Sequence, residues 1–178
     1  MTFKDDLVAA KDDIVKKDFV TRDGTVVPVS TDVGFNEAVK LKATYLYADM
    51  ANSSGLVAIS PKETVGKVLR LYLDLSVRII RKNGGHIRSF DGDRVMGIFI
   101  DDGRFNTAVK AAMQIKWACL NIIQPELNSR YGSIQKSGWL LKPGTGISSG
   151  EAFIIRGGVR RTGSDLVSVG LAPTWPPN

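Results

Sequence analysis

The sequence predicts an α+β protein with a ferredoxin-like βαββαβ core and additional strands. Two observations lead to this fold class. From Val39 onwards the hydrophobic pattern changes in the order strand, helix, strand, strand, helix, strand, with one more strand at the end, which is the order of the split βαβ plan. Between two strand-like runs, Asp91-Gly92 is a favoured hairpin turn. With 178 residues, we expect an N-terminal extension over residues 1–38 and one domain over residues 39–178 that looks short at its C-terminal end.

The extension and the first strand come first along the chain. Phe3, Leu7 and Ile14 recur at near-helical spacing, which predicts an amphipathic helix that packs on the body of the protein or on a partner. Residues 40–49 alternate as in a strand, so every second side chain lies on one face. The residues that share this face are Leu41, Ala43, Tyr45, Tyr47 and Asp49.

Two helices are predicted from the signals at their ends. Ser60-Pro61-Lys62-Glu63 offers an N-cap serine, a proline at the first helical position and a glutamate three residues after the cap. The apolar stripe that follows stops before Asn83-Gly84-Gly85, which predicts the end of this helix. Asn106 can cap a second helix that continues to about Ile123, and Pro125 is expected to stop it.

Two hairpins complete the predicted core. The first joins residues 86–90 to residues 93–100 through the Asp-Gly turn. The second joins residues 138–147 to residues 152–155 around Ser149-Gly150. In the ferredoxin-like plan the first strand is the antiparallel neighbour of the third, so the end of one lies beside the start of the other.

This topology places Asp49, at the end of the first strand, next to Asp93, at the start of the third. Two carboxylates that converge repel each other, and a bound divalent cation removes this cost. Oxygen ligands suit Mg²⁺ or Mn²⁺, which usually bind together with substrate phosphates. The pair predicts a metal-dependent nucleotide enzyme. Spacing alone is equally compatible with two surface acids at strand ends.

The segment after Asp49 is the second candidate feature. Ala51, Asn52, Ser53 and Ser54 are small or polar and lead out of a strand into a glycine. Backbone N–H groups in such a turn can form a nest for phosphate oxygens. Together with the metal pair, this predicts attack on an α-phosphate with a polyphosphate leaving group.

Composition excludes several other classes. The net charge is +6, but the densest basic cluster, at Arg156, Arg160 and Arg161, lacks interleaved aromatic residues, so we expect no nucleic-acid partner. No run approaches the ~18 apolar residues of a membrane span, and the N-terminus does not resemble a signal peptide. The single cysteine, Cys119, is expected to be a buried structural thiol in a reducing, cytoplasmic setting. His86 has no partner pattern for a catalytic triad.

From about Val39 to its end the chain resembles the class III nucleotidyl cyclase catalytic domain. That family shows F-A-D-[IM], then G-G-x-x-x-K-x-x-G-D-x-x-M-A-x-F, then G-I-x-x-G-E; this chain has YADM, GGHIRSFDGDRVMGIF and GISSGE in the same order. The resemblance implies that Asp49 and Asp93 bind two divalent cations, Mn²⁺ or Mg²⁺, assisted by the Met50 carbonyl. It also implies that the backbone amides of residues 51–54 hold the triphosphate of a nucleoside triphosphate, with Tyr47 in the substrate site, and that two copies form a head-to-tail homodimer with sites at the interface.

The departures from the family pattern concern the base and the late catalytic positions. Ser89 stands where purine cyclases carry a base-reading lysine, and Val167 stands at the second base-reading position. The late motif appears as GLAPTWPPN, which puts Thr174 at the position of the transition-state asparagine and Asn178 at that of the arginine. The purine-reading pair is therefore absent from the sequence.

These departures make the chain most similar to the pyrimidine cyclases of bacterial anti-phage systems (Pycsar), which make cyclic UMP or cyclic CMP and signal to a separate effector. The expected reaction converts UTP, or second CTP, to the 3′,5′-cyclic monophosphate and pyrophosphate. Three alternatives stay open: an adenylate or guanylate cyclase, a catalytically weak or inactive nucleotide-binding homologue, and a polymerase-like ferredoxin domain.

Overall fold

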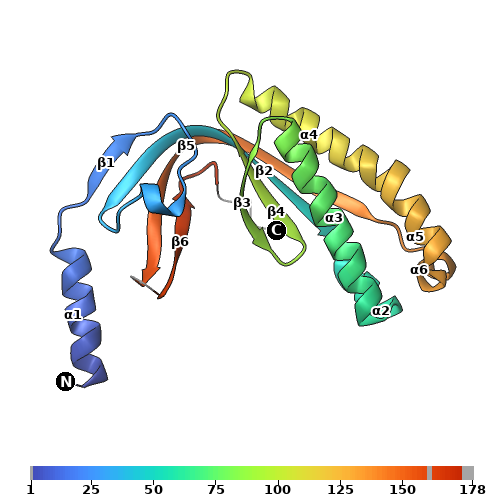
Figure 1. The fold of residues 1–178 in the computed structure, drawn as a ribbon, viewed down its shortest axis with the longest axis horizontal. Coiled ribbons are helices and arrows are strands. Elements are labelled where there is room, and N and C mark those ends of the chain that lie inside the picture. The colour runs from blue at the N-terminus through green and yellow to red at the C-terminus, as the bar shows by residue number, and fades with distance from the viewer. Residues whose placement is uncertain (1, 160–161, 174–178) are drawn as a thin grey trace. The chain divides into compact units, whose positions relative to one another are not determined.

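The computed structural model describes residues 2–159 and 162–173 (Figure 1). Hydrogen-bonded strands follow the order β3-β4-β2-β5-β6, and β1 pairs with β2. The elements are α1 (Phe3–Val15), β1 (Val20–Asp23), the 3₁₀ turn η1 (Ser30–Asp32), β2 (Glu37–Ala51), α2 (Ser53–Ile59), α3 (Lys62–Lys82), β3 (His86–Asp91), β4 (Arg94–Phe99), α4 (Arg104–Ala118), the π-helix η2 (Cys119–Ile123), α5 (Gln124–Arg130), α6 (Gly132–Ser137), β5 (Lys142–Val159) and β6 (Thr162–Val169). This confirms the predicted α+β class and the predicted order of strands and helices.

The chain divides into two compact units, one of residues 1–42 and 151–174 and the other centred on residues 43–150. In the second unit β2 pairs antiparallel with β4, with Thr44 opposite Phe99 and Ala48 opposite Val95. β3 also pairs antiparallel with β4 and therefore runs parallel to β2. This is the predicted topology, in which the first helical connection carries the chain to a parallel strand one place further out.

The helices cover one face of this part of the sheet. Leu46, Ala48 and Met50 of β2 form a core cluster with the buried residues of α3 and α4. Tyr45, Tyr47 and Asp49 alternate with them and so point to the opposite face. β2 is buried on both faces between residues 43 and 46, although the sequence predicted one apolar face.

The long helix α3 begins one residue later than predicted. Pro61, not Ser60, is its N-cap, and Ser60 Oγ instead lies 3.0 Å from Ser133 Oγ. Ser60 is the C-cap of the short helix α2, which the sequence did not predict. The predicted end of α3 is confirmed, since Gly84 after Asn83 has a φ of 78°.

The first hairpin also differs by one residue from the prediction. Asp91 pairs with Arg94, so Gly92 and Asp93 form the turn and Asp93 does not start the strand. Gly92 has a φ of 59°, a left-handed conformation in which glycine has no steric penalty. Asp93 therefore lies in the tight turn immediately before β4.

Pro125 does not stop the second helix, which was the prediction. The chain passes from α4 through η2 into α5, where Pro125 lies in the first turn. A first-turn N–H has no partner within its helix, so a proline there costs no hydrogen bond. Cys119 of η2 is 1% exposed, and burial raises the pKa of its thiol to about 12, as fits the predicted structural thiol. The short helix α6 follows α5 directly.

The predicted second hairpin around Ser149-Gly150 is wrong. β5 runs without interruption from Lys142 to Val159, and its antiparallel partner is β6, with Val159 opposite Thr162. Ser149 instead pairs through its side chain with Thr44 of β2, at 2.6 Å between the two oxygens. Pairing with a neighbouring strand thus overrides the local turn signal.

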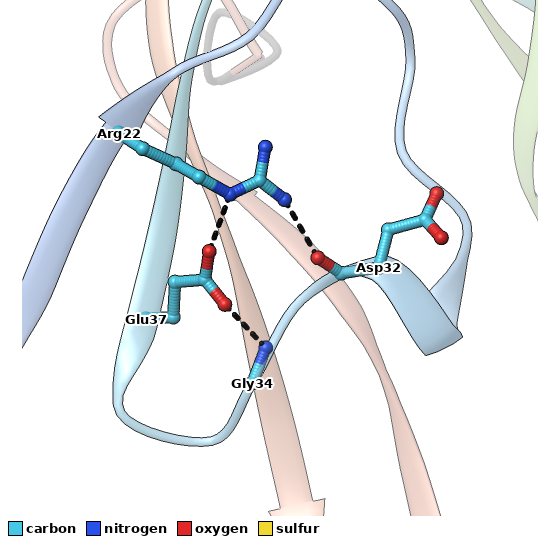
Figure 2. A network of polar contacts seen from close by, with 4 residues as sticks. All are labelled: Arg22, Asp32, Gly34 and Glu37. Atoms are coloured by element: carbon cyan, nitrogen blue, oxygen red, sulfur yellow. Dashed lines mark hydrogen bonds and ion pairs between the residues drawn. The ribbon is translucent and has the colours of Figure 1, made fainter.

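The first unit contains β1, which pairs parallel with the start of β2. A polar network fixes the connection between these strands (Figure 2). The Arg22 guanidinium donates to the Glu37 carboxylate and, at 2.7 Å, to the Asp32 carbonyl, while the Gly34 N–H donates to Glu37 at 3.0 Å. The Gly34 hydrogen bond and the Arg22 contact lower the pKa of Glu37. This network holds the first residues of β2 in place.

The predicted N-terminal helix is confirmed as α1, which has a capping box between Thr2 and Asp5. Its apolar side chains are exposed: Phe3 by 77%, Leu7 by 53% and Ile14 by 71%. The sequence predicted that this helix packs on the body of the protein or on a partner. Packing on the body is not seen among the described residues. None of the described helices is long and apolar enough to span a membrane.

Candidate active site

Asp49 and Asp93 lie together at one end of the β2–β4 pair. Ala48 is opposite Val95, so Asp49, one residue on, lies level with the first residues of β4 and with the turn that holds Asp93. The two carboxyl groups are within hydrogen-bonding range of each other. The topology predicted this juxtaposition, and the one-residue shift of the turn does not change it.

The surroundings of the pair disfavour the charged form of Asp49. Burial, and then the charge of Asp93, raise the pKa of the Asp49 carboxyl above its ordinary value. Arg94 and the Met50 N–H act in the opposite direction, but the net shift is upward. The Arg94 guanidinium also forms an ion pair with Asp91 at 3.2 Å. The protein therefore stabilises the ionised form of Asp49 less well than water does.

The donor set fits Mg²⁺ or Mn²⁺. It consists of the Asp49 carboxylate near the end of β2, the Asp93 carboxylate in the turn between β3 and β4, and the Met50 carbonyl on β2; the Met50 side chain is buried in the core. No group of three or more acidic, histidine or cysteine side chains gathers among the described residues. Few protein ligands are typical of Mg²⁺, which keeps waters and binds substrate phosphates as well.

A small cavity of about 120 Å³ lies beside the acid pair, lined by Tyr47, Ser89, Asp91, Arg94 and Met96. These residues are neighbours across three strands, since Tyr47 is opposite Met96 and Met96 is opposite Ser89. The structure therefore brings together Tyr47 and Ser89, two of the predicted substrate residues. Burial raises the pKa of the Tyr47 phenol, which keeps it a neutral hydrogen-bond donor.

The predicted phosphate segment lies at the junction of β2 and α2. Ala51 is the last residue of β2, Asn52 has a φ of 60°, and Ser53 and Ser54 open α2. The Trp139 indole donates to the Asn52 carbonyl at 3.1 Å, which helps to hold this left-handed residue. A Cβ on Gly55 would lie 2.5 Å from the Asn52 side chain, which would have to move to make room for it.

The structure adds residues that sequence reasoning missed. Asp91 and Arg94 line the small cavity, the charge of Arg94 acts on Asp49, and both residues flank Asp93 within the GGHIRSFDGDRVMGIF motif. On β5, a Cβ placed on Gly144 would meet only the Asp49 carbonyl oxygen, at 4.0 Å. β5 therefore passes close to the acid pair with a residue that has no side chain.

The structure does not test the remaining predicted positions. Val167 belongs to β6 in the other unit, where its side chain is 47% exposed. Thr174 and Asn178 lie outside the described residues, as do Arg160 and Arg161 of the basic cluster.

Comparison with known proteins places this site in a family. The chain is 38% identical over 174 residues to the uridylate cyclase of Rhodovulum sp. (strain MB263), which covers 97% of this chain and 72% of that protein. It is 34% identical to the uridylate cyclase of Xanthomonas perforans, over 98% of this chain and 75% of that protein. No family model matches the chain.

Solved structures bear out the fold. A class III adenylyl cyclase-like ATP-binding protein from Pseudomonas aeruginosa has a TM-score of 0.67 at 18% identity, over 95% of this chain and 37% of that one. A bacterial light-regulated adenylyl cyclase has a TM-score of 0.63 at 22% identity, over 76% of this chain and 38% of that one. The predicted cyclase-type fold is thereby confirmed. With relatives of this identity over nearly its whole length, the chain belongs to the uridylate cyclase family.

Proposed function

We propose that this chain converts UTP to 3′,5′-cyclic UMP and pyrophosphate in a reaction that requires divalent cations. The observation that carries the proposal is the convergence of Asp49 and Asp93 beside a small cavity lined by Tyr47 and Ser89. The names of the relatives support uracil as the base. CTP is the second candidate.

The reaction is an in-line displacement at the α-phosphorus. The ribose 3′-oxygen bonds to this phosphorus, the bond to the bridging oxygen breaks, and pyrophosphate leaves with the electron pair while the hydroxyl proton passes to solvent. Asp49, Asp93 and the Met50 carbonyl would hold two Mn²⁺ or Mg²⁺ ions, which when bound supply activation of the hydroxyl and neutralisation of the leaving charge. Asn52 and its neighbours would hold the triphosphate through their backbone amides.

The shape and chemistry of the cavity favour a pyrimidine. Its volume of about 120 Å³ is small, and Ser89 leaves a short hydroxyl in place of a long cation that would reach a purine edge. Uracil offers two carbonyl acceptors, and the Tyr47 phenol, the Ser89 hydroxyl and the Arg94 guanidinium are all donors. A site built to hydrogen-bond one base rejects a base that leaves these groups unpaired.

The wider setting follows from the resemblance to pyrimidine cyclases of anti-phage systems. We propose a cytoplasmic homodimer with sites at its interface, whose cyclic nucleotide product acts on a separate effector in defence against phage. In such a dimer Val167, Thr174 or their equivalents in the partner subunit could complete the site.

The direct test is turnover of UTP in the presence of Mn²⁺ by the wild-type chain and by Asp49→Asn and Asp93→Asn. Each change removes a metal ligand, and losses of single electrostatic contacts of this kind typically cost ~10²–10³ in kcat. Asp102→Asn, an exposed acid beyond the end of β4, is the matched control and should leave kcat unchanged. Wild-type rates in either site variant would contradict the metal role of the pair.

A further inference from the structure

A second cavity, of about 450 Å³, lies next to the predicted phosphate segment and is lined in part by a lysine whose side chain has no ion-pair or hydrogen-bond partner among the described residues. Ala51, Asn52, Gly55, Trp139 and Lys142 are among the residues that line it. Within the described part of the chain, the Lys142 ammonium forms no ion pair and no hydrogen bond. An exposed lysine is unremarkable by itself. What distinguishes Lys142 is its position relative to the acid pair.

Two contacts fix the register between β2 and β5. Thr44 and Ser149 join through their side-chain oxygens at 2.6 Å, and the Cβ position of Gly144 lies 4.0 Å from the Asp49 carbonyl. Both fit one antiparallel register, because moving five residues along β2 from Thr44 to Asp49 moves five residues back along β5 from Ser149 to Gly144. Two residues further on, this register sets Ala51 opposite Lys142.

The alternation of side chains puts Lys142 on the face of the acid pair. Leu141 belongs to the core cluster under the helices and Ile147 packs against it, so odd-numbered residues in this part of β5 point to the helical face. Lys142 therefore points to the opposite face, which it shares with Asp49. Directly opposite residues have their Cβ atoms about 4.5–5.5 Å apart, and Ala51 lies about 6.6 Å along the strand from Asp49.

Building on the proposed function, we infer that Lys142 binds the β- and γ-phosphates of the nucleoside triphosphate. The acid pair serves the reacting α-phosphate through its cations, and the polyphosphate then extends along β2 towards Ala51, Asn52 and the larger cavity. Lys142 supplies a positive charge there, as a compact ammonium with three donors. It would stabilise the charge that builds up on the departing pyrophosphate.

The sequence gives little sign of this role. Lys142 stands outside the G-I-x-x-G-E motif, and its neighbours Leu141 and Pro143 are apolar. Only the pairing of β5 with β2 brings it beside the phosphate segment. The inference also explains why the space between Asp49 and Lys142 is open: Gly144, which lies between them on β5, carries no side chain next to Asp49.

The test compares ligands with and without the terminal phosphates. The probes are α,β-methylene-UTP, which cannot be cyclised because its bridging carbon does not leave, and UMP, each titrated with Mn²⁺ by calorimetry. We expect Lys142→Ala to weaken α,β-methylene-UTP at least ~10-fold and UMP less than ~2-fold, and Lys142→Arg to restore most of the affinity, as for a charge contact with phosphate. Lys67→Ala, an exposed lysine of α3, is the matched control and should change neither affinity.

The outcomes separate this inference from the proposed function. Equal weakening of UMP and α,β-methylene-UTP, or no weakening of either, would overturn the role of Lys142 and leave the cyclase proposal intact. Failure of the wild-type chain to bind either nucleotide would overturn both. In steady-state kinetics the same variant should raise the inhibition constant of pyrophosphate and leave that of cyclic UMP unchanged.

Discussion

At the scale of single residues, the charge state of Asp49 is the property most directly tied to the proposed metals. Burial and the neighbouring Asp93 raise its pKa from the ordinary value of 3.8. The folded protein therefore holds the Asp49 proton more tightly than the unfolded chain does. As the pH rises through the interval between these two pKa values, the metal-free protein loses stability.

This gives a prediction with a definite sign. In the presence of a chelator, Asp49→Asn should gain stability relative to the wild type as the pH is raised from about 4 to 7, because the amide cannot ionise beside Asp93. Thermal unfolding midpoints of both proteins across this range measure it. A wild type that becomes more stable than the variant with rising pH would show that Asp49 is stabilised as a carboxylate by the protein alone.

Tyr47 is the residue at which base recognition can be tested most cleanly. Tyr47→Phe keeps the ring that packs against Met96 across the strands but removes the phenolic donor. We expect kcat/KM for UTP to fall ~10-fold with little change in the unfolding midpoint, because one base-directed hydrogen bond is lost. Tyr131→Phe, at the start of α6, is the control. Unchanged kcat/KM in Tyr47→Phe would remove this phenol from the substrate site.

At the scale of elements, the close passage of β5 beside the acid pair can be tested with Gly144→Val. A Cβ at this position meets only the Asp49 carbonyl, at 4.0 Å, so the variant should fold. The added methyl groups would occupy the path between Asp49 and Lys142, and we expect turnover of UTP to fall at least ~10-fold through a raised KM. Full activity would place the substrate elsewhere along β2.

The packing of β4 on α3 makes a prediction about stability. A Cβ on Gly97 would lie 2.8 Å from Ile80 Cγ2, and Ile80 is fully buried. Gly97→Ala should therefore lower the free energy of unfolding by about 1–3 kcal/mol, as overpacking does. Gly66→Ala in α3 is the control, with an effect of opposite sign. Nothing lies within 4 Å of a Cβ at this position, so the change should raise the free energy of unfolding by about 0.5–1 kcal/mol. Urea unfolding of both variants measures the difference.

Local sequence signals correctly predicted the helices and strands for which the contacts with neighbouring elements favour the same structure. β2, the end of α3 at its glycines and the antiparallel pairing of β2 with β4 are found as expected, because periodicity, end signals and topology agree there. The juxtaposition of Asp49 and Asp93 follows from that topology, and a turn displaced by one residue does not alter it.

The wrong secondary-structure predictions have a common cause: at these positions the structure depends on contacts between residues that are far apart in the sequence. Ser149-Gly150 reads locally as a turn, but pairing with β2 draws it into the 18-residue strand β5. Pro125 reads as a helix stop, but the preceding π-helix resets the register so that it falls in a first turn. Asp91, Arg94 and Lys142 could not be singled out from sequence alone, since the strand pairings that bring them to the site are not local.

At the scale of the whole molecule, fold and family are established more firmly than substrate. The class III cyclase fold also occurs in proteins described as adenylyl and guanylyl cyclases, so the fold does not select the base. Base choice rests on the cavity formed by Tyr47, Ser89, Arg94 and Met96 and on the likeness to uridylate cyclases.

The central claim is tested most directly by incubating the chain with Mn²⁺ and each of the four ribonucleoside triphosphates separately, and identifying the products by mass spectrometry. We expect cyclic UMP and pyrophosphate from UTP, with kcat/KM for UTP at least ~10-fold above that for ATP or GTP, a modest demand on hydrogen-bond discrimination. Preferred formation of cyclic AMP or cyclic GMP, or the absence of any cyclic product from UTP, would contradict the account.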